Sequence, residues 1–317
     1  MSSSPLPMGV GATGFSAALT AFRSALGAEG VLDTDQDRRT YIDPYAFGDG
    51  LDHESSAILA PAEVAEVQEV VRIANRFGVP LWPISRGKNF GYGAAAPVRR
   101  GDVILDLSRM NRILDVDEKQ ANCLLEPGVG YFDLFDHLWA EEIPLWMSVP
   151  GNSWGSVMGN ALDRGVGYTP YGEHTKNICG LEVVLPDGDL VRTGMGAFSN
   201  APTWSAYPFG FGPGWDQMFV QSNFGIVTKM GMWMMPEPES LMGMDVEFDK
   251  PEDLKVMVDT IAPLPDGYVL NAFVRVVGYA LDDTKRFEVP GDFEAFETTA
   301  DGRLITVRRE AGVLVAE

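Results

Sequence analysis

Cysteine and histidine are scarce in this sequence. Only Cys123 and Cys179 occur among 317 residues, which excludes a disulfide scaffold, a cysteine-rich zinc site and an iron–sulfur cluster held by this chain alone. A single disulfide is compatible with the count, but a reducing, cytoplasmic compartment is the simpler interpretation. The three histidines, His53, His137 and His174, are too scattered to indicate a metal site.

Basic residues and long apolar runs are also lacking. Lys and Arg total 24 against 45 Asp and Glu, so the net charge is −21. Such a surface repels phosphate backbones and anionic lipids, which argues against nucleic-acid and membrane partners. A bound anionic cofactor stays compatible, because backbone amides hold phosphates without net positive charge. No run of about 18 apolar residues predicts a membrane span, and residues 1–15 lack the basic and apolar regions of a signal peptide.

The remaining composition is that of a globular protein, with 45% apolar and 22% charged residues. Apolar spacing predicts helices over 14–27, 61–78 and 131–142, and residues 33–54 are expected to be a loop. Short strands and a hairpin are intermixed with these helices, which favours an α+β fold over a doubly wound sheet. We expect an N-terminal arm and helix (1–55), a main domain (56–238) and a partial further domain with an atypical tail (239–317).

Two glycine patterns mimic a dinucleotide fingerprint. Gly9, Gly11 and Gly14 match GxGxxG, but the preceding MSSSPLPM cannot be the buried strand that this motif requires. Gly91 and Gly93 begin a near match, but no helix follows it. Neither segment is therefore expected to form a Rossmann site.

The loop Ser85–Gly93 follows a predicted strand and has three glycines. Its successive backbone N–H groups can form an anion-binding nest, with Arg86 and Lys88 adding charge; the alternative is a flexible surface turn with both side chains in solvent. Pro150–Tyr171 is also glycine-rich, which fits either a ligand lying flat on bare main chain or a series of tight turns.

Polar residues close the second glycine-rich segment. Asp163, Arg164, Glu173 and His174 lie near one another in sequence, and they form either an ion pair or a polar wall beside a ligand. The run Met230–Met235 is interpreted as core, and no Ser–His–Asp or Cys–His set can be proposed from spacing.

Together, several segments resemble one flavoprotein family. They are PISRGKNFGYGAAAPVRRGDVILDL, EPGV, DRGVGYTPYGEH, LPDGDLVRTGMG and FGPGWDQMFVQSNFGIVTKMGMWMMP. These are similar to the vanillyl-alcohol oxidase and 4-cresol dehydrogenase proteins, which share a p-cresol methylhydroxylase-type FAD-binding domain. The resemblance extends from about Ala57 to Pro238, and the DRG and Glu-His strings are nearer to the 4-cresol dehydrogenase flavoprotein subunit.

The resemblance implies FAD as the cofactor and a role for each glycine-rich segment. Residues 83–89 would cradle the pyrophosphate, 155–166 would line the ribityl chain and isoalloxazine, and 126–129 and 225–227 would lie near the adenosine half. Tyr92 and Tyr168 would face the substrate as catalytic residues. The residues implied to bind FAD are Pro83, Ile84, Ser85, Arg86, Gly87, Lys88, Asn89, Pro127, Gly128, Val129, Pro150, Gly151, Gly155, Ser156, Gly159, Asn160, Gly165, Val166, Gly225, Ile226 and Val227.

The implied reaction is oxidation of a para-alkylphenol: a hydride passes from the benzylic carbon to flavin N5 and a quinone methide is left. The electron acceptor would be oxygen or a c-type cytochrome. Two alternatives stay open, namely an FAD-binding fragment without turnover and a flavin subunit that needs a partner acceptor.

The sequence also departs from this family. Members are longer, and the residue that binds FAD covalently lies in a cap domain beyond this chain, so FAD is expected to be held non-covalently. Gly151 stands near the position of the oxidases' catalytic Asp, and the ending LITVRREAGVLVAE has no family likeness. A cap cut short would expose apolar strands, which predicts either poor solubility or association into homo-oligomers.

Overall fold

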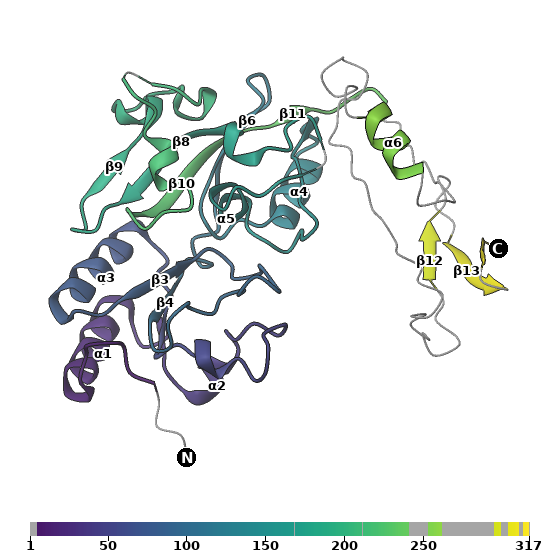
Figure 1. The fold of residues 1–317 in the computed structure, drawn as a ribbon. Helices are drawn as coiled ribbons and strands as arrows, with labels where there is room; N and C mark the ends of the chain where they lie inside the picture. Colours follow the sequence, from purple (N-terminus) through teal and green to yellow (C-terminus); the bar gives the residue numbers. More distant parts are fainter. Residues whose placement is uncertain are drawn as a thin grey trace. The chain divides into compact units, whose positions relative to one another are not determined.

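The computed structural model describes residues 5–167, 169–210, 212–240, 253–261, 295–298, 304–310 and 313–316. The chain divides into two compact units, Met1–Val274 and Arg275–Glu317. The first unit contains two main sheets and the helices packed on them (Figure 1). Among the described helices, none has both the length and the apolar character needed to cross a membrane.

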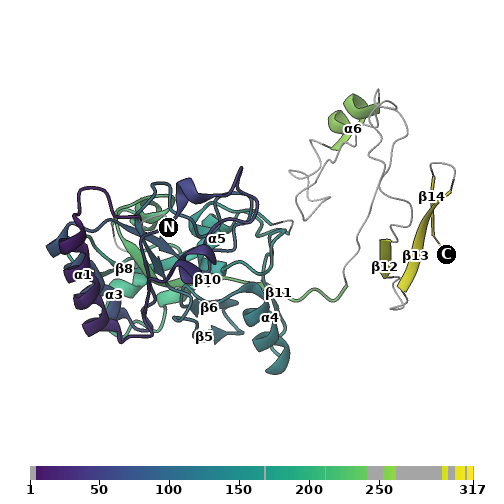
Figure 2. The same cartoon turned by 90° about the horizontal axis from the view of Figure 1, so that it is seen from below.

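A four-stranded sheet with the order β1-β2-β4-β3 forms one half of the first unit. Its strands are β1 (Val31–Leu32), β2 (Ile58–Leu59), β3 (Leu81–Ile84) and β4 (Val103–Asp106). Strands β2 and β3 lie on the two sides of β4, and both run parallel to it. Parallel strands of one sheet need a long crossover connection. Helix α3 (Val64–Phe77) provides that connection between β2 and β3, and it packs beside α1 (Ala12–Leu26) in both views (Figure 1 and Figure 2).

The sequence of α3 explains its placement. Val67, Val70, Val71 and Ala74 recur at helical spacing, and all four are buried in the core cluster shared with α1 and β4. Gly78 ends the helix in the left-handed conformation, at φ 66°.

The second sheet is antiparallel, with the order β5-β6-β10-β8-β9. Its strands are β5 (Ile113–Asp117), β6 (Asn122–Leu125), β8 (Ile178–Val184), β9 (Leu190–Arg192) and β10 (Ile226–Trp233). Helices α4 (Tyr131–Ala140) and α5 (Val157–Leu162) share a core with it, and β7 (Leu145–Trp146) pairs with β11 (Met235–Pro236). Val184 of β8 belongs to the core of the first sheet, so the two sheets are packed together. The expected α+β fold is thereby confirmed.

Short 3₁₀ helices connect these elements. They are Leu51–His53, His174–Asn177, Gly194–Ala197, Trp204–Ala206 and Asp216–Phe219. The methionines at 230, 232, 234 and 235 are buried, which agrees with the predicted core.

The segment expected to be a loop contains a helix, α2 (Asp35–Arg39). Thr34 caps it: the Thr34 hydroxyl accepts from the Asp37 amide at 3.1 Å, and the Asp37 carboxylate accepts from the Thr34 amide at 3.1 Å. This capping box accounts for a helix that has too few apolar residues to be recognised by periodicity.

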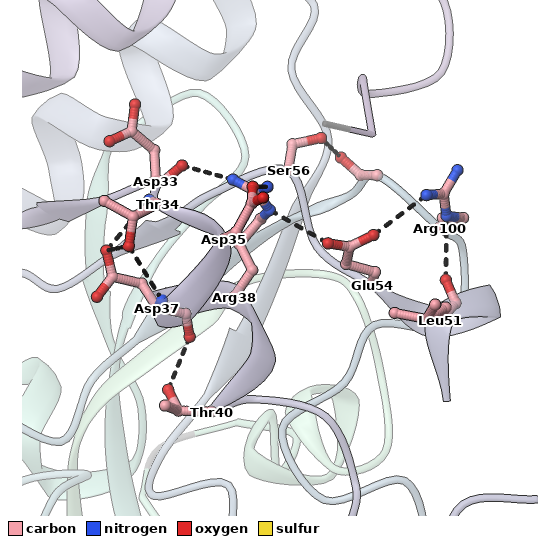
Figure 3. Close-up of polar contacts among 11 residues, drawn as sticks. Asp33, Thr34, Asp35, Asp37, Arg38, Thr40, Leu51, Glu54, Ser56 and Arg100 are labelled. Carbon is pink, nitrogen blue, oxygen red and sulfur yellow. Dashed lines mark hydrogen bonds and ion pairs between the residues drawn. The ribbon is translucent and has the colours of Figure 1, made fainter. Parts of the chain in front are cut away.

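Arg38 joins α2 to the residues that follow β1 and to Glu54, which precedes β2 (Figure 3). It is 2% exposed and donates to the Asp33 carbonyl, to the Asp35 carboxylate and to Glu54. Glu54 also pairs with Arg100, at 3.1 Å. The segment after α2 therefore follows a helix that is held in place by these hydrogen bonds.

Fewer residues are described after 240. Helix α6 (Asp253–Ile261) belongs to the part that was expected to be a further domain. In the tail, the described strands β12 (Ala295–Thr298), β13 (Leu304–Glu310) and β14 (Val313–Ala316) form an antiparallel sheet.

Candidate functional site

Glycine-rich segments that are far apart in the sequence meet in the first unit. We name them the β3 loop (83–89), the β6 loop (127–130) and the α5 segment (155–160). The α5 segment is bound to the β6 loop: the Ser156 hydroxyl donates to the Pro127 carbonyl at 2.6 Å, and Gly130 and Ser156 form an antiparallel bridge.

The β3 loop closes the cluster from the side of the first sheet. A Cβ at Gly159 would overlap the Ser85 hydroxyl, and a Cβ at Gly130 would overlap the Arg86 guanidinium. Asn152 adds a bond from its side-chain amide to the Lys88 carbonyl. The three segments thus touch where glycine leaves the main chain bare.

The charged residues of the β3 loop have specific partners. Arg86 forms an ion pair with Asp133 of α4 and donates to the Gly128 carbonyl at 3.4 Å. The Lys88 ammonium lies 5.8 Å from the centre of the Phe90 ring. Arg86 therefore joins the β3 and β6 loops, and its charge is already balanced by a carboxylate.

A buried polar cluster lies around Asn160, the last residue of the α5 segment. The side chain of Asn160 lies against Gly165, and its Oδ1 contacts Nδ1 of His174, which is 0% exposed. The Tyr131 hydroxyl is 3.4 Å from the same nitrogen. Burial lowers the pKa of His174 to about 4, so the ring is neutral near pH 7.

His174 therefore lies in a buried polar cluster, and a polar wall beside a ligand stays a prediction. The ion pair in this region is instead between Glu173 and Lys176, at 2.6 Å. Burial also raises the pKa of the Asp163 carboxyl. The sequence placed His174 near the site, but spacing alone does not reveal that it contacts Asn160.

The pKa of His174 predicts a pH effect on stability. Between pH 6.5 and about 4 the unfolded chain binds a proton at this residue and the folded chain does not, so the free energy of unfolding falls as pH falls. We expect His174 to contribute about 2 kcal/mol to this loss between pH 7 and pH 5. Urea unfolding at both pH values should show a smaller loss for His174→Gln than for the wild type, with His137→Gln as the control. Equal losses in the wild type and His174→Gln would contradict a neutral, buried His174.

The remaining predicted site residues lie in several different places. Tyr92 is 85% exposed, in the turn after the β3 loop. Pro150 and Gly151 lie in the loop before the α5 segment, and Val166 pairs with Glu173. Tyr168 lies outside the described residues.

Residues 225–227 are not part of this cluster by their described contacts. A Cβ at Gly225 would meet Val183 and the Val184 carbonyl of β8, and Ile226 packs against the core of the first sheet. Ile226 and Val227 begin β10 directly after Gly225, and their backbone conformation follows from strand pairing.

The site has the features that a phosphate-bearing dinucleotide needs. Its loops pack closely at Gly128, Gly130 and Gly159, where a side chain would overlap a neighbouring residue. Within the described residues, buried polar atoms near Gly167 have no hydrogen-bond partner, namely Ser148 Oγ, Thr169 Oγ1 and His174 Nε2. The amides of Gly128, Gly130 and Gly159 bind acceptors within the protein, whereas the unpaired polar groups fit a flat, polar cofactor such as FAD.

Comparisons with known proteins agree with this geometry. Residues 55–194 match the FAD binding domain family. The 4-cresol dehydrogenase flavoprotein subunit of Pseudomonas putida is 43% identical over 261 residues, which are 82% of this chain and 50% of that protein. The 1'-carboxy-chondrochloren decarboxylase of Chondromyces crocatus is 44% identical over 222 residues, 70% of this chain and 40% of that protein.

A solved structure shows the same fold. The crystal structure of p-cresol methylhydroxylase with substrate bound matches with a TM-score of 0.79 and 40% identity, over 84% of this chain and 52% of that one. The chain spans about half the length of the relatives that it matches. Residues 55–194 are therefore an FAD-binding domain with FAD as its cofactor, and the chain is similar to the 4-cresol dehydrogenase flavoproteins.

Proposed function

We propose that this chain holds FAD non-covalently and takes part in the oxidation of a para-alkylphenol. The observation that carries the proposal is the meeting of the β3 loop, the β6 loop and the α5 segment on bare main chain, with Tyr92 displayed beside them. The printed activity of the Pseudomonas relative supports the substrate class.

Each segment has a distinct task in this proposal. Amides of the β3 loop hold the pyrophosphate, because Arg86 is committed to Asp133 and leaves that task to the main chain. The α5 segment and residues 165–166 line the flavin, with Pro150 and Gly151 closing one side. The β6 loop lies toward the adenosine half, and residues 225–227, which the resemblance also placed there, have no part in this proposal.

The protein's own part in the chemistry is to bind and orient the phenol. The Tyr92 hydroxyl donates to the substrate's phenolic oxygen and stabilises the phenolate, and Tyr168 is the second catalytic residue of this proposal. FAD supplies the hydride acceptor, N5, and the phenolate that loses a benzylic hydride becomes a quinone methide, which adds water at that carbon.

The electrons must then reach a second acceptor. The Pseudomonas relative is named as a flavoprotein subunit, so we propose a separate partner protein, such as a c-type cytochrome, in preference to oxygen. The Chondromyces relative is named as a decarboxylase. The same FAD-binding segments therefore occur with another reaction, and the substrate must be tested directly.

The visible spectrum of the purified chain tests the proposal. We expect flavin absorption that moves to the supernatant after acid precipitation, and bleaching when 4-cresol is added without oxygen. Tyr92→Phe should retain flavin and bleach at least about 10-fold more slowly, because it loses the donor to the phenolate. Absence of flavin, or flavin that no phenol bleaches, would refute binding or oxidation respectively.

A further inference from the structure

The turn that displays Tyr92 is held by a carboxylate from a distant part of the chain. Oδ2 of Asp43 accepts from the amide of Gly91 at 3.0 Å and from the amide of Gly93 at 2.9 Å. One oxygen thus binds the residues immediately before and after Tyr92. The other oxygen, Oδ1, accepts from the Tyr45 amide at 2.9 Å.

The Asp43 carboxylate is suited to hold this turn in its ionised form. The residue is 5% exposed, and burial alone would raise its pKa. The amides of Tyr45, Gly91 and Gly93 outweigh that effect and lower the pKa below its usual range. Asp43 therefore keeps its negative charge at neutral pH, and hydrogen bonds to a charged acceptor are the stronger kind.

Packing does not impose the shape of the turn. Gly91 has φ +81° and Gly93 has φ +99°, and a Cβ at either position would meet nothing within 4 Å. Ala94 is left-handed as well, at φ 46°. Because this turn is open, hydrogen bonds must select its conformation. The amides that donate to Asp43 belong to the residues directly before and after Tyr92.

The segment around Asp43 is itself held in place by contacts with the rest of the protein. The Tyr41 hydroxyl donates to Asp106, at the end of β4, at 2.7 Å. Arg38 anchors the preceding helix to Glu54 (Figure 3). On the other side, the rings of Tyr45 and Phe90 are 6.4 Å apart. The carboxylate is therefore presented to the turn by a braced segment.

We propose that Asp43 is a positioning residue that sets the direction of Tyr92, and that it divides the glycine-rich loop into two parts. Residues 83–89 keep their amides for the cofactor, whereas the nest at 91–93 is already occupied by the protein's own carboxylate. The inference rests on the proposed function only for the role of Tyr92. It adds a residue that aligns the substrate without contacting it.

Asp43→Asn tests this inference, because it keeps the shape and removes the charge. We expect hydrogen exchange in the peptide containing Gly91–Gly93 to become at least about 10-fold faster. We also expect the affinity of the FAD-loaded protein for 4-cresol, read from the flavin spectrum, to fall at least 10-fold, while the FAD affinity changes less than twofold. Asp49→Asn is the matched control, since Asp49 accepts one amide in the same region, from Leu51 at 3.1 Å.

The outcomes separate this inference from the proposed function. Unchanged exchange at Gly91–Gly93 would overturn the inference, as would a loss of FAD affinity equal to the loss of 4-cresol affinity. If the wild type bound FAD but gave no response to 4-cresol, phenol oxidation would be refuted. The exchange and FAD measurements would then decide the role of Asp43 by themselves.

Discussion

Replacing Gly87 by alanine is expected to weaken FAD binding about 100-fold, which corresponds to about 2.8 kcal/mol. Gly87 has φ +61°, and a Cβ there would lie 2.6 Å from the Cβ of Ala95 and 3.1 Å from Cδ1 of Ile84. Ala95 is 6% exposed and has no rotatable side chain, so the backbone of the β3 loop must move. That movement displaces the amides that we propose to hold the pyrophosphate. Titration of the apoprotein with FAD, followed by flavin fluorescence, measures the loss.

Gly78→Ala is the control for backbone strain. Gly78 has φ +66°, but a Cβ there would meet nothing within 4 Å. Both variants carry a left-handed alanine, at a cost of about 1–2 kcal/mol, and only the Gly87 variant adds an overlap in the β3 loop. Gly78→Ala should lower stability and leave FAD affinity within twofold of the wild type. Wild-type affinity in Gly87→Ala would contradict the proposed role of the β3 loop.

Local patterns in the sequence were sufficient for the elements around the site. Helix α3 follows from the spacing of its valines and from Gly78, and strand β4 from a short apolar run. Helix α2 was missed because it has a strong cap and hardly any apolar residues, and periodicity detects only the latter. Elements that bury an apolar face were therefore the predictable ones.

The way in which the site is assembled was harder to predict from the sequence. Glycine content predicted main chain prepared for a ligand, and family resemblance supplied the identity of that ligand. Asp43 was not found, because its amide partners lie 48 and 50 residues further along the chain and nothing local marks the pairing. The nest expected in the loop exists in part, but at residues 91–93 an internal carboxylate occupies it. Only the fold reveals which amides remain available.

Removal of a buried carboxylate in the second sheet is expected to have the largest effect on stability. Glu182 on β8 is fully buried, and it forms ion pairs with Arg192 of β9 at 2.8 Å and with Lys229 of β10 at 2.9 Å. The Thr228 hydroxyl donates to it at 3.1 Å. One side chain therefore joins three neighbouring strands, and the guanidinium of Arg192 also lies 4.8 Å from the ring centre of Trp204.

Glu182→Ala should lower the free energy of unfolding by about 3–4 kcal/mol. Removing one partner of a buried pair leaves the other charge uncompensated, and Lys229 is only 19% exposed. Glu63→Ala is the matched control, because Glu63 pairs with Arg112 at the surface, where an ion pair contributes at most about 1 kcal/mol. Urea unfolding at pH 7 measures both. A similar small loss in the two variants would show that the charges of the sheet are compensated elsewhere.

Glu182 also leads to a second prediction, which concerns the stability of the protein at acidic pH. Burial opposes ionisation of Glu182, but Lys229 and Arg192 outweigh it and hold its pKa below the ordinary value of 4.5. A carboxylate with a lowered folded pKa stabilises the protein above its unfolded pKa, and this stabilisation is lost as pH falls through the folded value. The wild type should therefore lose more stability below pH 4.5 than Glu182→Gln, whereas the two should respond alike between pH 5 and 7. Adding Lys229→Met to Glu182→Met should recover part of the loss at pH 7, since the pair is then replaced by apolar groups. A double variant no more stable than Glu182→Met alone would show that Glu182 acts mainly through Arg192 and Thr228.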